Sequence, residues 1–460
     1  MKIAAPEKRA LFLRHLAEQF FENSEDCVIE ASSKDSAARV TVNGNTALFD
    51  ASGYTWLDGE HRERLALGRA FAAAADPPCP PPYGILTGVR PVKMALKYLG
   101  IFGDGAAARL SEDYLVRKDR AKLLSFLAEK ERALEKTVGS DQILLYVSIP
   151  FCPTRCAYCS FISAAAPGHT ELIDKYLGIL KNELSGLSRI AGEKGLRVRA
   201  AYVGGGTPGI LTPPQLEELL DAMYRGFGLE GAEVTAELGR PDVITAEKLD
   251  ALKSFGVRRV CVNPQTTDDR VLKLIGRSHS ASDFFDAYRL AASRGFGINC
   301  DLIAGLPGDS PEGFQKSLRE VEALGPEDIT VHSFCLKNGA RGGFSLPPSS
   351  QALEMLDFSA SYCISRGYLP YYLYRQKNAS GALENLGWAK PGAECLYNVM
   401  MMEDMLPVFA AGAGSISKLF RGGKVVRAAN HKYPFEYISD PAKLDANLGI
   451  IGELSGSDRN

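Results

Sequence analysis

The chain has 460 residues, 45% of them hydrophobic and 23% charged, proportions typical of a globular protein large enough for more than one domain. Its 53 lysines and arginines nearly balance 55 aspartates and glutamates, which argues against a nucleic-acid or anionic-membrane surface as its main task. No stretch is long and apolar enough to span a bilayer or to act as a secretory signal, so we expect a cytoplasmic protein.

Residues 1–140 predict an accessory α+β domain. The pattern indicates a helix at 8–22, a hairpin at 38–51 with a turn at Asn43-Gly44, a proline-rich break at 76–84 and charged helices over 112–137. A lid, a docking domain and a substrate-specificity domain are all compatible with this region.

Residues 141–345 alternate short β-branched runs with longer amphipathic segments, which is typical of repeated βα units and a parallel sheet. Strands are predicted at 143–149, 199–205, 232–238, 257–263, 297–305 and 328–334. Helices are predicted between them at 170–191, 213–225, 246–255, 283–294 and 311–324. The fold class is therefore α/β, and six units favour a partial (β/α)6 barrel. A doubly wound open sheet is the alternative.

Residues 346–460 predict a C-terminal α+β extension that covers the barrel. It begins with a helix at 350–366 and an aromatic strand-like run at 368–376, followed by a Gly/Asn-rich loop at 377–393 and a mixed tail.

Three of the ten cysteines have the spacing of metal ligands: Cys152, Cys156 and Cys159, within YVSIPFCPTRCAYCSF at 146–161. This segment follows the first predicted barrel strand, and active sites of such barrels lie at the C-terminal strand ends. Three thiolates on one loop suit a soft centre, and the missing fourth ligand favours an iron–sulfur cluster with one open iron. A zinc site completed by His169, or a chance group of core cysteines, are the alternatives.

A glycine-rich segment, YVGGGTPG at 202–209, follows the second predicted strand. Consecutive glycines let backbone groups approach a ligand closely. Taken alone, such a segment is also compatible with a simple glycine-rich turn.

The CxxxCxxC spacing, with Tyr158 before the last cysteine, and the GGGTP segment together resemble the signature of the radical S-adenosylmethionine (SAM) superfamily. The resemblance implies that the cysteines bind a [4Fe–4S] cluster whose fourth iron chelates SAM. It also implies that the reduced cluster cleaves SAM to methionine and a 5′-deoxyadenosyl radical, and that GGGTP meets the methionyl amino group.

Further motifs resemble the oxygen-independent coproporphyrinogen III dehydrogenase family. They are the cysteine segment itself, DLIAGLPG at 301–308 and GAGSIS at 412–417. The segment YGILTGVRPVK at 83–93 resembles the longer, Z-type subgroup of that family, and this match covers nearly the whole chain.

This resemblance implies two sets of ligand-binding residues. The first would line the SAM on the cluster: Tyr146, Tyr158, Gly205, Glu237 and Ile416. The second falls at positions that in the family hold a second SAM or the space beside it: Gly206, Thr207, Gln265, Arg277, Asp301 and Cys335. The residue types fit, because an arginine and an aspartate can pair with a carboxylate and an amino group. A solvated Glu237 and a surface Arg277 remain the simpler interpretations.

The resemblance implies an oxidoreductase of haem synthesis. It would convert propionates of coproporphyrinogen III, a small tetrapyrrole, into the vinyl groups of protoporphyrinogen IX, with a flavodoxin- or ferredoxin-like electron donor. Such chemistry needs a dry cavity and cations that grip the other propionates, for which Arg375, Lys377 and Arg90 are candidates.

Two of the departures from the family pattern lie in the cysteine segment. Ser148 stands where the family has a histidine, and Phe161 stands where the dehydrogenases have a further cysteine. Phe161 is typical of relatives that traffic haem or transfer methyl groups. A radical SAM methyltransferase acting on a tetrapyrrole or another aromatic compound, and a haem-binding chaperone, are therefore the alternative functions.

Overall fold

The computed structural model describes residues 1–21, 24–77, 80–159, 164–165, 170–336, 343–376 and 378–455. Its main element is an eleven-stranded sheet with the order β13-β14-β12-β11-β10-β9-β8-β5-β15-β16-β17. The six predicted strands are confirmed as its parallel centre: β5 (Gln142–Ile149), β8 (Arg197–Gly205), β9 (Glu233–Gly239), β10 (Arg259–Val262), β11 (Gly297–Ala304) and β12 (Asp328–Ser333). Within the described residues the two edge strands do not pair, so the barrel is partial.

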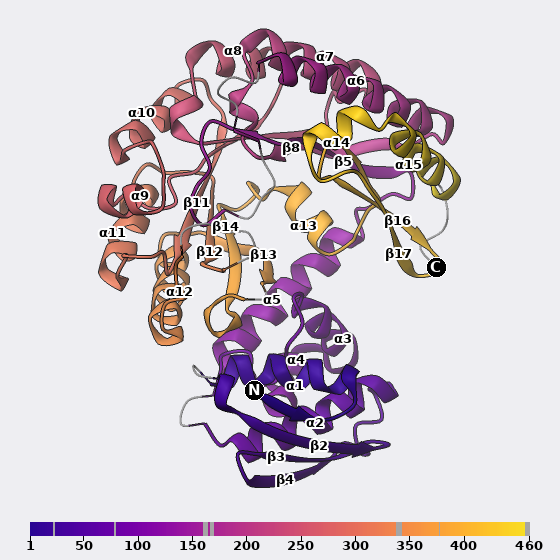
Figure 1. Ribbon diagram of the computed structural model, residues 1–460, viewed down its shortest axis with the longest axis vertical. Coiled ribbons are helices and arrows are strands. Elements are labelled where there is room, and N and C mark those ends of the chain that lie inside the picture. Colours follow the sequence, from indigo (N-terminus) through magenta and orange to yellow (C-terminus); the bar gives the residue numbers. More distant parts are fainter. Residues whose placement is uncertain are drawn as a thin grey trace.

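The parallel strands follow one another in space in chain order, without the reversal that defines a doubly wound sheet. The connecting helices are α6 (Thr170–Glu193), α7 (Pro213–Phe227), α8 (Ala246–Ser254), α9 (Asp269–Leu274), α10 (Ala281–Ala292) and α11 (Pro311–Glu322). Figure 1 shows them as an arc outside the strands. Side-chain caps start several of them; the Thr212 hydroxyl and the Gln215 side chain, for example, form a capping box on α7.

The C-terminal residues extend this sheet at both edges. They form α12 (Ser349–Ser365), β13 (Leu369–Arg375), β14 (Glu384–Ala389), α13 (Leu396–Met402), β15 (Val408–Ala411), β16 (Ile416–Arg421), β17 (Lys424–Ala429), α14 (Pro434–Ser439) and α15 (Pro441–Leu454). β15 runs parallel to β5, whereas β14 pairs antiparallel with β12.

The prediction of a loop over 377–393 is wrong for β14. Its sequence, ENLGWA, contains asparagine and glycine, which are typical of loops, yet all six residues are buried between β12 and β13. Gly387 is needed because a Cβ there would lie 2.0 Å from Cε1 of Tyr372. Tertiary packing on both faces thus overrides the local propensity.

The N-terminal residues form a separate four-stranded sheet of β1 (Lys2–Ala4), β2 (Val28–Lys34), β3 (Ala37–Val42) and β4 (Asn45–Asp50). Five helices accompany it: α1 (Glu7–Phe20), α2 (Gly59–Ala75), α3 (Val92–Phe102), α4 (Ala106–Tyr114) and α5 (Lys118–Glu135). Figure 1 shows this sheet at the opposite end of the molecule from the helical arc. The domain limits at residues 140 and 345 remain predictions.

Buried charges connect α5 to the C-terminal residues. Arg120 is 3% exposed and forms ion pairs with Asp357 and with Glu384, at 2.7 Å in each case. None of the described helices has the length and apolarity required to cross a membrane.

Candidate active site

A cavity of about 330 Å³ lies at the C-terminal ends of the parallel strands. Twelve of the predicted site residues line it: Cys152, Cys156, Tyr158, Cys159, Gly205, Gly206, Thr207, Glu237, Gln265, Arg277, Asp301 and Cys335. They come from loops and strand ends that are distant in sequence, which is how a parallel α/β fold builds a site.

The cysteine loop begins at β6 (Phe151–Cys152), which pairs with β7 (Ala164–Ala165). Cys152, Cys156 and Cys159 are half-buried. The Thr207 hydroxyl donates a hydrogen bond to Sγ of Cys152 at 3.4 Å, and the Ala157 amide donates to the Ile275 carbonyl at 3.0 Å. Neighbouring elements therefore hold the loop on both sides.

The glycine segment packs against this loop. The Gly206 amide donates to the Ile149 carbonyl and the Thr207 amide to the Phe151 carbonyl, both at 2.8 Å. A Cβ on Gly206 would lie 2.6 Å from the Phe151 carbonyl oxygen and 2.9 Å from Sγ of Cys152. The glycines therefore let the backbone of this segment lie close to the cysteine loop.

Arg277 presents unused donors to the cavity. Its Nη2 donates to the Tyr158 hydroxyl at 3.2 Å, while its Nε and Nη1 are buried without a hydrogen-bond partner among the described residues. Leaving buried charged donors unpaired is costly, so this guanidinium fits an anionic ligand such as a carboxylate. Burial raises the pKa of Tyr158 to about 12, which keeps its hydroxyl neutral.

Asp301 is held by two amides. Asn263 Nδ2 donates to one carboxylate oxygen at 2.8 Å and Asn299 Nδ2 donates to the other at 2.7 Å. Gln265 lines the cavity and has a left-handed backbone conformation, with φ at 68°. Its backbone amide donates a hydrogen bond to the backbone carbonyl of Asp301 at 3.0 Å. A non-glycine residue in this region is strained, which is common at binding sites.

Glu237 accepts a hydrogen bond from the Tyr202 hydroxyl at 3.1 Å. Burial and the nearby Asp301 carboxylate raise the pKa of Glu237 to about 7, against the opposing hydrogen bond from Tyr202. Its charge thus changes near neutral pH.

Several polar residues of this cavity were not predicted from the sequence, among them His332, Asn263, Asn299, Tyr202 and Tyr374. Nε2 of His332 lies 3.7 Å from Asp301 Oδ2. Although burial lowers it, hydrogen bonding and charge from Asp301 raise the pKa of His332 above its usual value. The available signal was a polar residue within the predicted strand at 328–334.

Two predicted SAM contacts lie elsewhere. Tyr146 stacks with Tyr202 and Tyr397, at ring-centroid distances of 6.4 and 6.3 Å, and does not line the cavity. Ile416 begins β16 with 44% of its surface exposed, also outside the cavity lining.

The predicted carboxylate-gripping role does not fit Arg375 or Arg90. The Arg375 guanidinium donates to the Ala382 carbonyl at 2.6 Å, to Gln19 Oε1 at 3.0 Å and to the Leu86 carbonyl. Arg90 forms an ion pair with Asp404. Each cation is therefore occupied within the protein.

Lys377, Phe161 and His169 lie outside the described residues. His169 is the proposed fourth ligand of the zinc alternative. No three His, Cys, Asp or Glu among the described side chains converge on the position of a single metal ion. The ligands of an iron–sulfur cluster bind separate irons, so this does not conflict with three thiols that line one cavity.

Fold and site together define an α/β protein that carries a three-cysteine loop beside a ligand cavity at the strand ends. The family model of the radical SAM superfamily matches residues 146–321. The oxygen-independent coproporphyrinogen-III oxidase-like protein HemZ of Bacillus subtilis is 36% identical over 77% of this chain and 74% of its own. The chain belongs to the radical SAM superfamily, in the family of HemZ-like proteins.

Other relatives share the barrel. The haem chaperone HemW of Escherichia coli is 28% identical over 63% of this chain and 74% of its own. The solved structure of coproporphyrinogen III oxidase (HemN) from Escherichia coli superposes with a TM-score of 0.53 at 23% identity, over 69% of this chain and 72% of that one. The latter similarity shows the common fold.

The superfamily uses a [4Fe–4S] cluster and SAM, and the residues of this chain fit both. Cys152, Cys156 and Cys159 face one cavity and would hold the cluster. At the predicted second SAM position, the unpartnered nitrogens of Arg277 would receive a carboxylate and Asp301 would accept from an amino group. Glu237, predicted beside the SAM on the cluster, would accept from its hydroxyl or amino groups.

Proposed function

We propose that the protein is a radical SAM oxidoreductase that oxidatively decarboxylates propionates of coproporphyrinogen III to vinyl groups, giving protoporphyrinogen IX. The observation that carries this proposal is the three-cysteine loop beside a cavity lined by Arg277, Asp301 and Glu237, in a chain 36% identical to an oxygen-independent coproporphyrinogen-III oxidase-like protein. The methyltransferase and haem-chaperone alternatives would use the same cavity but would not form vinyl groups.

When bound, the cluster and SAM supply a 5′-deoxyadenosyl radical that removes a hydrogen atom from the substrate. Each propionate would then lose CO2 and one electron, which balances the electron consumed in cleaving one SAM, and the vinyl group would remain. The protein's part is to orient the ligands and to exclude water: Arg277 holds a carboxylate, and Asp301, fixed by Asn263 and Asn299, holds an amino group.

One partner and a location follow from this chemistry. We propose a flavodoxin- or ferredoxin-like donor that reduces the cluster, and a cytoplasmic location, because the cysteine thiols need a reducing compartment.

The test is anaerobic. Reconstituted protein receives dithionite, SAM and coproporphyrinogen III, and mass spectrometry follows 5′-deoxyadenosine and vinyl-bearing porphyrin together. We expect both products from the wild type and neither from Cys156→Ala. A matched control, Cys27→Ala, removes a buried thiol outside the cavity and should retain both.

Each outcome discriminates. Deoxyadenosine without a vinyl product would reject the decarboxylation, and a product heavier by one methyl group would identify a methyltransferase. SAM cleavage by Cys156→Ala would reject the assigned cluster ligands.

A haem-binding role is the second candidate, favoured by the 28% identity to the haem chaperone HemW of Escherichia coli. It predicts that purified protein binds haem and forms no vinyl product. Titration with haem, followed in the Soret band, tests it, and an unchanged spectrum would eliminate it.

A further inference from the structure

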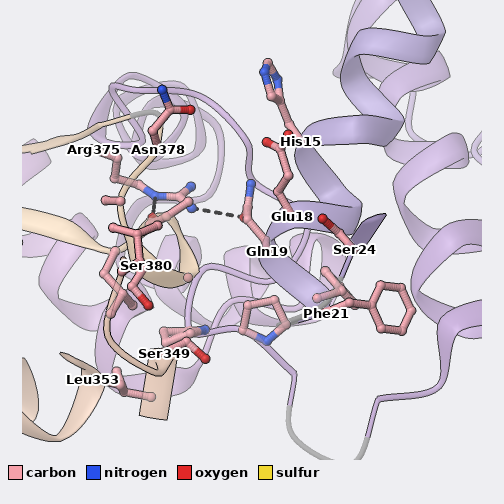
Figure 2. A pocket seen from close by; sticks show the side chains of 18 of the residues that line it. His15, Glu18, Gln19, Phe21, Ser24, Ser349, Leu353, Arg375, Asn378 and Ser380 are labelled. Atoms are coloured by element: carbon pink, nitrogen blue, oxygen red, sulfur yellow. Dashed lines mark hydrogen bonds between the residues drawn. The ribbon is translucent and has the colours of Figure 1, made fainter. Parts of the chain in front are cut away.

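A second and larger cavity, of about 790 Å³, lies between the N-terminal residues and the C-terminal extension. Figure 2 shows His15, Glu18 and Gln19 of α1 on one side and Ser349, Leu353, Arg375 and Ser380 on the other. The proline-rich break after α2 supplies further lining residues. The volume lies within the range of small-molecule sites, ~300–1,000 Å³.

One described residue, Gln376, lines both this cavity and the cysteine cavity. Its Oε1 accepts a hydrogen bond from Sγ of Cys335 at 2.6 Å, and its Nε2 donates to the Tyr374 hydroxyl at 3.4 Å. A ligand in the larger cavity can therefore contact a residue that also forms part of the wall of the cysteine cavity.

The walls of the larger cavity are apolar and neutral. Its described lining includes Phe20, Phe21, Leu346, Leu353, Leu383 and six prolines, with hydroxyl and amide groups from residues such as Ser24, Thr87, Asn378 and Ser380. Only His15, Glu18 and Arg375 among the described lining residues can carry charge.

Arg375 belongs to the wall. Figure 2 shows its hydrogen bond to Gln19, which connects α1 to the end of β13. Its guanidinium carbon lies 4.5 Å from the ring centroid of Tyr83, and its nitrogens bind protein oxygens. Its charge is therefore used within the fold, and the ligand meets few cations.

We propose that this cavity holds the body of the substrate. This inference rests on the proposed function and deepens it: the apolar ring of a tetrapyrrole packs on prolines and phenylalanines, with neutral hydroxyl and amide groups around it. Only the reacting side chain passes Gln376 into the cysteine cavity. The remaining carboxylates stay solvated at the cavity mouth rather than being gripped by arginine or lysine.

Titration of cluster-reconstituted full-length protein, in the presence of SAM, with oxidised coproporphyrin III tests this site. The probe's Soret band and fluorescence report binding. Because neutral groups form the contacts, we expect Kd to change less than about threefold between ~50 and ~500 mM KCl. Binding that weakens about tenfold or more over that range would overturn the neutral recognition.

Two bulky substitutions, in segments of the wall that are distant in sequence, locate the site. Leu353→Trp and Val89→Trp should each raise Kd about tenfold or more by filling the cavity. Val89 is 44% exposed, so the larger side chain can be accommodated without unfolding, and circular dichroism checks both variants. The control, Ile364→Trp, lies on the same helix as Leu353, is 58% exposed and does not line the cavity, so it should bind as wild type.

The outcomes separate this inference from the proposed function. Absence of porphyrin binding, or wild-type affinity in both folded wall variants, overturns the cavity assignment, whereas vinyl formation can still occur in the same preparations. Porphyrin binding that both wall variants weaken supports the cavity even where no vinyl product forms.

Discussion

The two unpartnered nitrogens of Arg277 are the most specific ligand signal at the scale of single residues. A lysine at this position would keep the charge but lose the planar fork that can bind a carboxylate with two hydrogen bonds.

We therefore expect Arg277→Lys to weaken SAM binding about tenfold or more, equivalent to ~1.4 kcal/mol or more. Isothermal titration of reconstituted protein under anaerobic conditions measures this. Arg289→Lys, on the exposed side of α10, is the matched control. Equal affinities of Arg277→Lys and wild type would show that the guanidinium does not hold the SAM carboxylate.

Glu237 gives the site a pH dependence. Its raised pKa of about 7 means that it is about half protonated at neutral pH and becomes an acceptor-only carboxylate as the pH rises. Since the hydroxyl and amino groups of SAM are donors, SAM affinity should increase between about pH 6 and pH 8.

Titrations at about pH 6, 7 and 8 measure this increase, which should reach severalfold if Glu237 binds SAM only when ionised. Glu237→Gln cannot ionise, so its affinity should be lower and flatter with pH. The same rise in the glutamine variant would assign the pH dependence to another group.

At the scale of elements, the end of β8 supports the cysteine loop through Gly206. The backbone hydrogen bonds from Gly206 and Thr207 leave no space for a side chain between strand and loop.

Gly206→Ala should therefore displace the loop and reduce cluster incorporation severalfold, measured as iron content and absorbance after reconstitution. Gly192→Ala is the control, because nothing lies within 4 Å of a Cβ at this position of α6. That variant should be stabilised by about 0.5–1 kcal/mol, as expected for Gly→Ala in a helix. Full iron loading of Gly206→Ala would contradict the packing argument.

At the scale of the whole molecule, two buried carboxylates meet where the N-terminal residues pack on the C-terminal extension. Glu131 of α5 is 1% exposed, and neither its oxygens nor those of Glu403 have hydrogen-bond partners among the described residues. Burial and mutual repulsion raise the pKa of Glu131 well above its usual value, and burial raises that of Glu403.

A carboxyl group whose folded-state pKa is raised binds more protons in the folded than in the unfolded state. Stability therefore falls as the pH rises above about 4.5 toward the folded-state values. Glu131→Gln should increase the free energy of unfolding at about pH 8 by ~1–3 kcal/mol and flatten its pH dependence.

Urea denaturation at about pH 6 and pH 8 checks this prediction. Glu129→Gln, on the exposed face of α5, should leave the pH dependence unchanged. A Glu131→Gln variant with the wild-type pH dependence would show that the carboxylate pair does not control it.

The six parallel strands, their connecting helices and the three-cysteine loop could be predicted from the sequence alone. These features depend on local periodicity, on caps and on ligand spacing, all of which neighbouring residues encode. The order of βα units also determined that residues from separate strand ends, such as Glu237 and Asp301, would meet at one edge.

Other features depend on contacts between distant parts of the chain and could be recognised only in the folded structure. β14 is a strand because β12 and β13 enclose it, and Arg375 is structural because carbonyls far away in sequence surround it. Asn263 supports Asp301 because the neighbouring strands β10 and β11 bring the two side chains together, whereas Asn299 lies two residues before Asp301 on β11 itself. The larger cavity has the same origin, since its walls come from α1 and from residues more than 300 positions later, and no local pattern encodes a contact of that range.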